Sequence, residues 1–105
     1  MDRRKSSRLR ARIDALVHCG DDEGAGVLAE LSYSGALVEE CALRPPVGTP
    51  ARLYLFLPGE PALELCGRVG RHAEAGLALV YELHDVALRR RVDAVVAHLA
   101  HAAAS

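Results

Sequence analysis

Aromatic side chains are scarce in this sequence, which has no tryptophan, one phenylalanine and three tyrosines. With so few of them, the chain offers little surface on which the bases of a nucleic acid would stack. It also has no uninterrupted apolar run near the about 18 residues of a transmembrane helix, and its first residues are basic and polar. We therefore expect a cytoplasmic protein that neither spans a membrane nor is exported.

Cysteine is also sparse, and its spacing is uninformative. Cys19, Cys41 and Cys66 are an odd number of widely separated residues, which is not the pattern of a disulfide framework. Each stands beside apolar neighbours in a run typical of a strand, so we expect buried thiols that behave as small hydrophobic side chains. This usage fits the reducing cytoplasm, and we assign the cysteines no chemistry.

The composition is that of one soluble globular domain. Half of the 105 residues are apolar and 26% are charged, which is too hydrophobic for a disordered chain and sufficient for a packed core. A chain of this length lies within the usual range of a single domain. We therefore expect one domain rather than two.

Basic residues are concentrated near the amino terminus, although the net charge is only −1. Such a cluster attracts an anion, whether a phosphate, a nucleic acid or an acidic protein surface, and the plainer alternative is a solvated basic tail. We expect residues 1–12 to form a flexible basic arm and residues 13–105 to form the folded domain. The basic residues of the arm are Arg3, Arg4, Lys5, Arg8, Arg10 and Arg12.

Six short segments have the pattern of β-strands. In the first, Ile13, Ala15 and Val17 alternate with more polar residues, and in the fourth Leu53 and Leu55 alternate with aromatic ones. Six short strands separated by regular turns predict a small, mostly antiparallel barrel or sandwich. The predicted strands are residues 13–19, 27–31, 35–39, 52–57, 63–71 and 76–82.

Glycine, proline and serine indicate how these strands are connected. Residues 20–24 have the composition of a turn, and the hydroxyls and glycine of residues 32–35 suit a sharp bend. Residues 44–50 contain three prolines and are expected to form an irregular crossover. Gly67 and Gly70 lie inside the fifth predicted strand, where they indicate bulges or close approach of another backbone.

From Asp85 onward the apolar residues recur with the period of a helix, which we expect to end at about residue 103. Asp85 suits the N-cap position. The apolar stripe is expected to lie over an open end or edge of the barrel, since one or two heptads are too few for a coiled coil. The residues of the stripe are Leu88, Val92, Val95, Val96 and Leu99.

Two short motifs stand out. Arg4 and Arg8 form an RxxxR pair, extended by Arg3 to RRxxxR, and the ELSYSG segment at residues 30–35 has the shape of a (D/N)xSxxG motif. In these residues the sequence resembles the PilZ family, which has an arginine arm before the first strand and an acid-or-amide, serine and glycine element between early strands. A six-stranded barrel and a C-terminal helix follow. The segment GLALVY is also similar to the late GLGVxF strand of the family, with Tyr81 at the aromatic position.

The resemblance implies a mainly β fold, namely a six-stranded antiparallel β-barrel with a C-terminal α-helix. It also implies a receptor that binds cyclic di-GMP, changes conformation and signals to a protein partner. In such a site the two arginines grip phosphates and guanine, while the second motif shapes the other wall. The implied ligand-binding residues are Arg4, Arg8, Glu30, Ser32 and Gly35, with Arg3, Lys5 and Arg10 as secondary candidates that add attraction.

The chemistry of the ligand suits these residue types. Cyclic di-GMP presents two phosphodiester anions and two guanines, and arginine is always charged, planar and forked. A guanidinium group binds phosphate oxygens or the O6 and N7 edge of guanine, and it stacks on a purine face. Ser32 can donate a hydrogen bond, while Gly35 leaves room for close backbone approach. Alternatively, Ser32, Ser34 and Gly35 only build the bend.

Glu30 is where the chain departs from the family pattern. The family has Asp or Asn at this position, and Glu carries the same acceptor on a stem one methylene longer. This difference favours an alternative function, that of a divergent adaptor that does not bind the nucleotide and acts through protein contacts. The retained RxxxR pair favours nucleotide binding.

Two further functions are less well supported by the residues. Nonspecific binding of nucleic acid by the arm is opposed by the acidic remainder of the chain and by the few aromatic residues. An enzyme or a metal site is not indicated: His98 and His101 lie on one helix without an acidic or thiol residue nearby to complete a ligand set. His18 and Cys19 are adjacent on a strand and so point to opposite faces. We predict no enzymatic activity, no metal and no cofactor.

Overall fold

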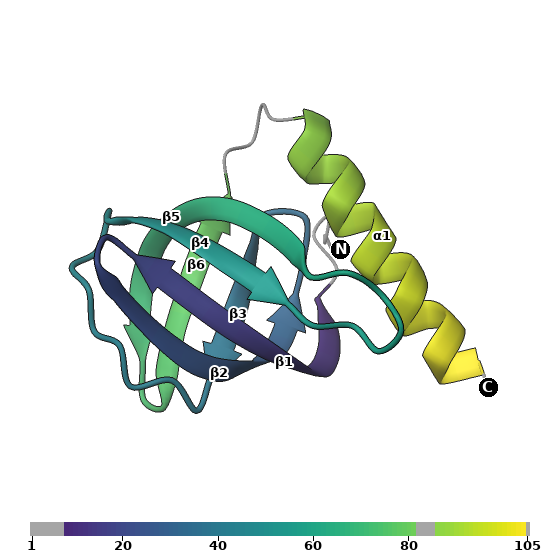
Figure 1. The fold of residues 1–105 in the computed structure, drawn as a ribbon, viewed down its shortest axis with the longest axis horizontal. Coiled ribbons are helices and arrows are strands. Elements are labelled where there is room, and N and C mark those ends of the chain that lie inside the picture. The colour runs from purple at the N-terminus through teal and green to yellow at the C-terminus, as the bar shows by residue number, and fades with distance from the viewer. Residues whose placement is uncertain (1–7, 82–85, 105) are drawn as a thin grey trace, which may run out of the picture.

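The structure, a computed structural model, describes residues 8–81 and 86–104, the last four of them by their backbone alone. Within these ranges the chain forms six strands and one helix, and the strands close into an antiparallel barrel in the order β1-β2-β3-β6-β5-β4 (Figure 1). The predicted fold class is therefore confirmed. The elements are β1 (Leu9–Cys19), β2 (Asp22–Leu31), β3 (Gly35–Glu39), β4 (Pro50–Leu55), β5 (Leu63–Ala73), β6 (Gly76–Tyr81) and α1 (Val86–Ala104).

The predicted alternation determines what the barrel encloses. Val17 on β1, Leu53 and Leu55 on β4, and Leu77 on β6 have no solvent-exposed surface. Successive residues of a strand point to opposite faces, so the neighbours of these residues face outward. Since the inside of so small a barrel is filled by its own side chains, a ligand has to bind at the outer wall or the rim.

β1 begins earlier than predicted. It starts at Leu9, which pairs with Leu31, because its antiparallel partner β2 continues that far. Arg10 lies opposite Glu30 in this ladder, and the register shifts between Arg10 and Ile13. Residues 9–12 are therefore part of the strand, and the folded domain begins before the boundary predicted at residue 13.

β2 also begins earlier, and the predicted turn at residues 20–24 is limited to its first two residues. Gly24 and Gly26 lie inside the strand, where another part of the chain crosses closely. A Cβ atom would lie 2.7 Å from the Leu43 side chain at Gly24 and 2.7 Å from that of Val38 at Gly26. These glycines therefore serve close packing, although the sequence predicted a turn at Gly24.

β4 and β5 differ from the prediction at their ends. β4 is shifted toward the amino terminus and begins with Pro50, since a first strand position tolerates proline. The alternation of buried and exposed side chains continues past the end of β4, since Phe56 is exposed and Leu57 is buried. β5 continues to Ala73. The sequence predicted bulges or close backbone approach at Gly67 and Gly70: the register against β6 shifts between Val69 and Arg71, and a Cβ atom at Gly67 would lie 2.3 Å from the Val80 carbonyl oxygen.

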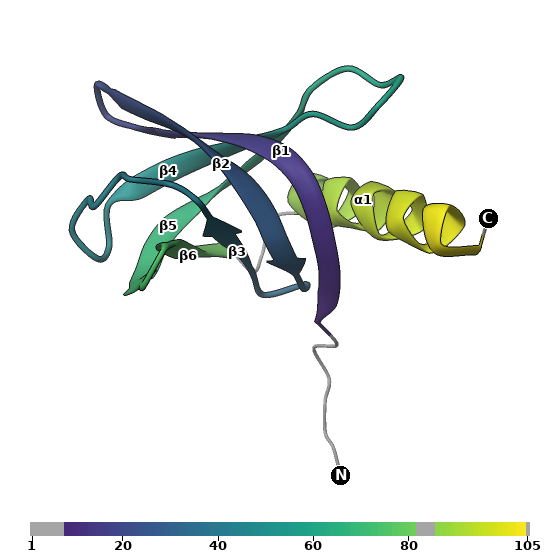
Figure 2. The same ribbon diagram turned by 90° about the horizontal axis from the view of Figure 1, so that it is seen from below.

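The helix packs as its periodicity predicts. Leu88, Val92 and Val95 are buried, and α1 lies alongside the barrel next to β5 (Figures 1 and 2). Arg91 Nη1 donates to the carbonyl oxygen of Glu64, 3.3 Å away, on the same strand. The predicted N-cap Asp85 and the predicted strand end Glu82 lie outside the described residues. In the described part of the chain, no helix is long and apolar enough to cross a membrane.

Candidate functional site

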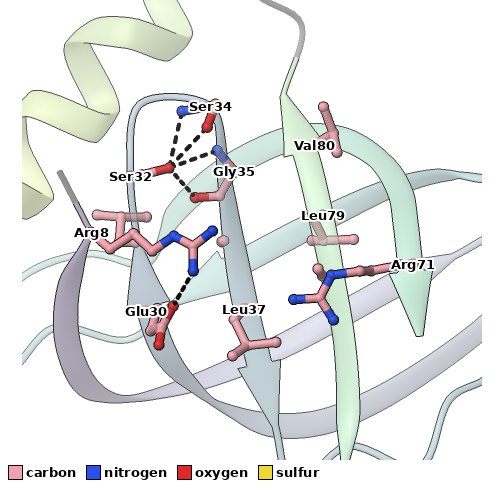
Figure 3. Close-up of a pocket in the computed structure, with 12 residues that line it drawn as sticks. Arg8, Glu30, Ser32, Ser34, Gly35, Leu37, Arg71, Leu79 and Val80 are labelled. Carbon is pink, nitrogen blue, oxygen red and sulfur yellow. Dashed lines mark hydrogen bonds and ion pairs between the residues drawn. The ribbon is translucent and has the colours of Figure 1, made fainter. Parts of the chain in front are cut away.

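A cavity of about 250 Å³ lies on the wall of the barrel where β2 bends into β3 (Figure 3). Its apolar part includes Leu37 of β3 and Ala78 and Val80 of β6, which are not buried because the alternation of these strands turns them outward. The cavity is therefore an external one. Its polar lining comes from Arg8, Glu30, Ser32, Ser34 and Arg71.

The predicted bend at residues 32–35 closes one end of this cavity. The Ser32 N–H donates to the carbonyl oxygen of Gly35 at 2.9 Å. The Ser32 hydroxyl oxygen accepts the N–H groups of Ser34 and Gly35, each at 3.2 Å. Its proton is directed to Ser34 Oγ at 3.1 Å or to the Gly35 carbonyl oxygen at 3.3 Å. Ser32 thus builds the bend and lines the cavity at once.

Gly35 is required by the packing of the bend against β6. A Cβ atom at this position would lie 2.3 Å from the carbonyl oxygen of Leu79, closer than any real Cβ contact. The bend is also attached to β6 by the Tyr81 N–H, which donates to the carbonyl oxygen of Ser34 at 3.1 Å. The bend therefore has a fixed position on the barrel wall.

Arg8 and Glu30 meet at the same cavity. Arg8 directly precedes β1, Glu30 lies near the end of β2, and the antiparallel pairing of the two strands brings both side chains together. Arg8 Nη1 lies 3.7 Å from Glu30 Oε1, with 74% of the arginine side chain and 33% of the glutamate side chain exposed. An ion pair this exposed contributes little stability, so Arg8 is available for another anion.

The other predicted site residues are placed differently or lie outside the described residues. Arg3, Arg4 and Lys5 lie outside the described residues. Arg10 lies on β1 opposite Glu30 but does not line the cavity. Of the predicted ligand-binding set, the structure brings together Arg8, Glu30, Ser32 and Gly35.

Arg71 also lines the cavity, and sequence reasoning missed it. It follows the bulge at Gly70 on β5, where a Cβ atom would lie 2.5 Å from the Val80 side chain. Figure 3 shows Arg8 and Arg71 on opposite sides of the cavity, with Leu37 between them. The glycine before Arg71 was the only signal, because a bulge redirects the residue that follows it.

The resulting site carries two guanidinium groups and one carboxylate around an apolar surface. Among the described residues, no carboxylate pairs with Arg71. The excess of positive charge suits an anion, and the forked donors suit a phosphate or the edge of a guanine. The apolar surface between the two arginines suits the flat face of a base.

Tyr33 connects the bend to the helix. Its hydroxyl group donates to the carboxylate of Asp93 on α1, and the Arg89 guanidinium carbon lies 4.9 Å from the centre of its ring. The hydrogen bond to Asp93, followed by burial, raises the pKa of Tyr33 above its ordinary value, so the phenol stays protonated. The two residues are 60 positions apart, and sequence reasoning did not pair them.

The cysteines and histidines form no comparable site in the described part of the chain. Cys19 and Cys41 are buried as expected, whereas Cys66 is only partly buried. Burial raises the pKa of the Cys19 and Cys66 thiols, which keeps them protonated and weakly nucleophilic. Among the described residues, no group of three or more His, Cys, Asp or Glu side chains is placed to hold a metal ion.

Comparison with known proteins identifies one family. The family profile described as PilZ domain matches residues 2–98 of the chain. A comparison with curated protein sequences gave no match.

Several solved structures resemble this one. The crystal structure of the PilZ domain of CeSA from a cellulose-synthesizing bacterium has a TM-score of 0.79 and 26% identity, with coverage of 91% of this chain and 100% of that chain. The Bacillus subtilis inhibitor of motility (MotI/DgrA) has a TM-score of 0.69 and 19% identity, with coverage of 96% of this chain and 53% of that chain. A Legionella uncharacterized protein has a TM-score of 0.61 and 17% identity, with coverage of 94% and 99%. The last two likenesses concern the fold alone.

Proposed function

Because the chain belongs to the PilZ domain family, we propose that its cavity binds cyclic di-GMP and that the chain acts as a receptor rather than an enzyme. PilZ domains are generally receptors or adaptors for this nucleotide. The observation that carries the proposal is that Arg8 and the Ser32–Gly35 bend line one cavity, although they lie on different strands of the barrel. In a receptor of this kind, bound nucleotide changes what the chain presents to a protein partner.

The charges around the cavity match the two charges of the ligand. Cyclic di-GMP carries one negative charge on each of two phosphodiesters, and Arg8 and Arg71 stand on opposite sides of the apolar surface. Each guanidinium group can take a phosphate or the O6 and N7 edge of a guanine. Leu37 and Val80 then contact the faces of the bases. Removing these apolar surfaces from water favours binding.

The size of the cavity leaves a part in binding for the basic arm. Pockets for drug-sized ligands have volumes of about 300–1,000 Å³. The cavity here has only about 250 Å³ and therefore holds part of a dinucleotide. We propose that Arg4 supplies contacts to the remainder, with Arg3 and Lys5 adding electrostatic attraction.

Glu30 is compatible with this ligand. Its carboxylate is paired with Arg8 at 3.7 Å, and a phosphodiester that replaces it as the partner of Arg8 gives a charge-assisted hydrogen bond in exchange. The freed side chain keeps an oxygen that can accept a hydrogen bond from a guanine, as the amide oxygen of an asparagine or glutamine would. The exposure of the pair keeps the cost of the exchange small.

Isothermal titration of the purified chain with cyclic di-GMP, with GMP as the control ligand, tests the proposal. We expect saturable binding of cyclic di-GMP and much weaker binding of GMP, which carries only one base and one phosphate. Binding should also persist when salt is raised, whereas binding of the basic arm to DNA should collapse. A folded chain that gives no heat with cyclic di-GMP would contradict the proposal.

A second function, that of an adaptor without nucleotide, is favoured by one observation. All hydrogen-bonding capacity of the Ser32 hydroxyl is used inside the bend, so the serine and glycine of the motif have a structural role without any ligand. A chain that captures a protein partner equally well with and without cyclic di-GMP would support this function. A partner whose affinity changes on adding cyclic di-GMP would support the receptor.

A further inference from the structure

The outer corner of the Ser32–Gly35 bend is fastened to the C-terminal helix. Tyr33 is the corner residue, and its hydroxyl group donates to Asp93 of α1. The Arg89 guanidinium carbon lies 4.9 Å from the centre of the Tyr33 ring, within the range of a cation–π contact. In Figure 3 the ribbon of α1 runs beside the bend that carries Ser32 and Ser34.

The helix residues of this contact belong to one face of α1. Arg89 and Asp93 are four positions apart, so their side chains are neighbours on the helix surface and hold the ring from one side. Tyr33 keeps 38% of its surface exposed, so the contact is peripheral and can open without disturbing the core.

The rest of α1 is attached to the barrel in a different way. Leu88, Val92 and Val95 are buried, and Arg91 donates to the backbone of Glu64 on β5. No acidic residue stands in the first turn, and arginines near a helix amino terminus oppose its macrodipole. The contact of Asp93 with Tyr33 is therefore a second attachment of α1, separate from its buried apolar stripe.

We propose that Tyr33, Arg89 and Asp93 form a latch through which the nucleotide site controls α1, and that cyclic di-GMP opens it. This inference rests on the proposed function. The Ser32 hydroxyl is fully engaged inside the bend, so a bond from Ser32 or Ser34 to the ligand replaces one of these hydrogen bonds and reshapes the bend. Tyr33 lies between the two serines and moves with them, which withdraws its hydroxyl group from Asp93.

Thermodynamic linkage then fixes how variants of the latch behave. If bound ligand favours the open latch by some factor, the closed latch lowers the affinity for the ligand by the same factor. Tyr33→Phe removes the hydrogen bond but keeps the ring, and it should bind cyclic di-GMP about three- to tenfold more tightly. Asp93→Asn should act in the same direction, and the double variant should gain no more than the stronger single one, because both changes remove one interaction.

Amide hydrogen exchange of α1 is the second measurement. In the unaltered chain, saturating cyclic di-GMP should speed exchange of residues 88–95 about threefold or more, since an opened latch loosens this half of the helix. In Tyr33→Phe exchange should be fast already, and ligand should add little. Tyr54→Phe makes the same chemical change on β4, at a tyrosine that does not line the cavity and takes no part in the contact between Tyr33 and Asp93, and it should behave as the unaltered chain does.

The outcomes of these two measurements separate failure of the latch proposal from failure of the receptor function. If titration shows binding but α1 exchanges alike with and without ligand, the latch proposal is wrong while the receptor function stands. Unchanged or weaker binding by Tyr33→Phe and Asp93→Asn would also overturn it. If the unaltered chain does not bind cyclic di-GMP at all, the proposed function and ligand control of the latch both fail. If Tyr33→Phe does not fold, Asp93→Asn provides the test. Asp93 is exposed, so its replacement leaves the core unchanged.

Discussion

The Arg8 guanidinium lies 3.7 Å from the Glu30 carboxylate at the rim of a cavity that the Ser32–Gly35 bend closes. This pair joins the end of the basic arm to the end of β2. It also means that an internal carboxylate occupies Arg8 in the absence of a phosphate. A ligand anion and Glu30 therefore compete for one guanidinium group.

Removing this competitor should strengthen binding. Glu30→Gln keeps the acceptor oxygen and the stem length but loses the charge, so we expect cyclic di-GMP to bind about two- to fivefold more tightly, as for the loss of an exposed ion pair. Isothermal titration measures the change. Glu40→Gln is the matched control, because it removes the partner of Arg12, 3.2 Å away, outside the cavity. A large loss of affinity in Glu30→Gln alone would mean that the charge itself binds the ligand.

Arg71 provides a prediction that the sequence motifs do not make. Arg71→Ala should weaken binding of cyclic di-GMP about 10- to 100-fold, since a charge-assisted hydrogen bond contributes about 1.5–3 kcal/mol. Arg52→Ala removes the same charge from β4, where Arg52 is 3.6 Å from Glu64 and does not line the cavity. Equal, small effects of the two changes would show that Arg71 contributes only to long-range attraction.

The bend should tolerate no side chain at position 35. Gly35→Ala would place a methyl group 2.3 Å from the Leu79 carbonyl oxygen, and the backbone of β6 has to move to relieve the contact. We expect a loss of at least about 1–3 kcal/mol in the free energy of unfolding in urea. Ser34→Ala adds no atom to the same bend and should cost less. A stable Gly35→Ala chain with unchanged ligand affinity would contradict the packing described for the bend.

Tyr81 carries a polar atom that the barrel leaves unsatisfied. Its hydroxyl group is buried and has no hydrogen-bond partner in the described part of the chain. Tyr81→Phe keeps the ring and removes this group, so the free energy of unfolding should rise by about 1 kcal/mol. Urea denaturation at neutral pH measures it. A less stable variant would mean that the hydroxyl group has a partner.

The same residue makes stability depend on alkaline pH. Burial raises the pKa of Tyr81 well above its ordinary value of 10.0. Above pH 10 the unfolded chain loses this proton while the folded chain keeps it, so the contribution of Tyr81 to stability falls as pH rises. The difference in unfolding free energy between Tyr81→Phe and the unaltered chain should therefore widen above pH 10. A constant difference would contradict the assigned burial of the phenol.

The fold was readable from the sequence because burial on one face of a strand leaves a period of two. Leu53, Leu55 and Leu57 are all buried, and Phe56 between them is exposed, as the alternation predicted. Strand ends were less readable. Gly24 was predicted to lie in a turn, and only the close approach of the Leu43 side chain explains its place inside β2.

The site could be predicted where its residues are close in sequence, but not where the barrel brings distant residues together. Ser32 and Gly35 form one local motif, and their bend was predicted. Arg71 reaches the cavity only through the pairing of β5 with β6 and the bulge at Gly70. The contact of Tyr33 with Asp93 depends on where α1 packs, which no local pattern specifies.

In the proposed complex, one ligand contacts Arg8, the Ser32–Gly35 bend and Arg71 together. Nuclear magnetic resonance of the isotope-labelled chain, titrated with cyclic di-GMP, tests it most directly. We expect saturable shifts of the Arg8 and Arg71 side-chain signals and of the amides of residues 32–35, with little change at the β1–β2 hairpin around Gly20 and Asp21. Shifts confined to that hairpin, or no saturable shifts at the cavity in a folded chain, would contradict it.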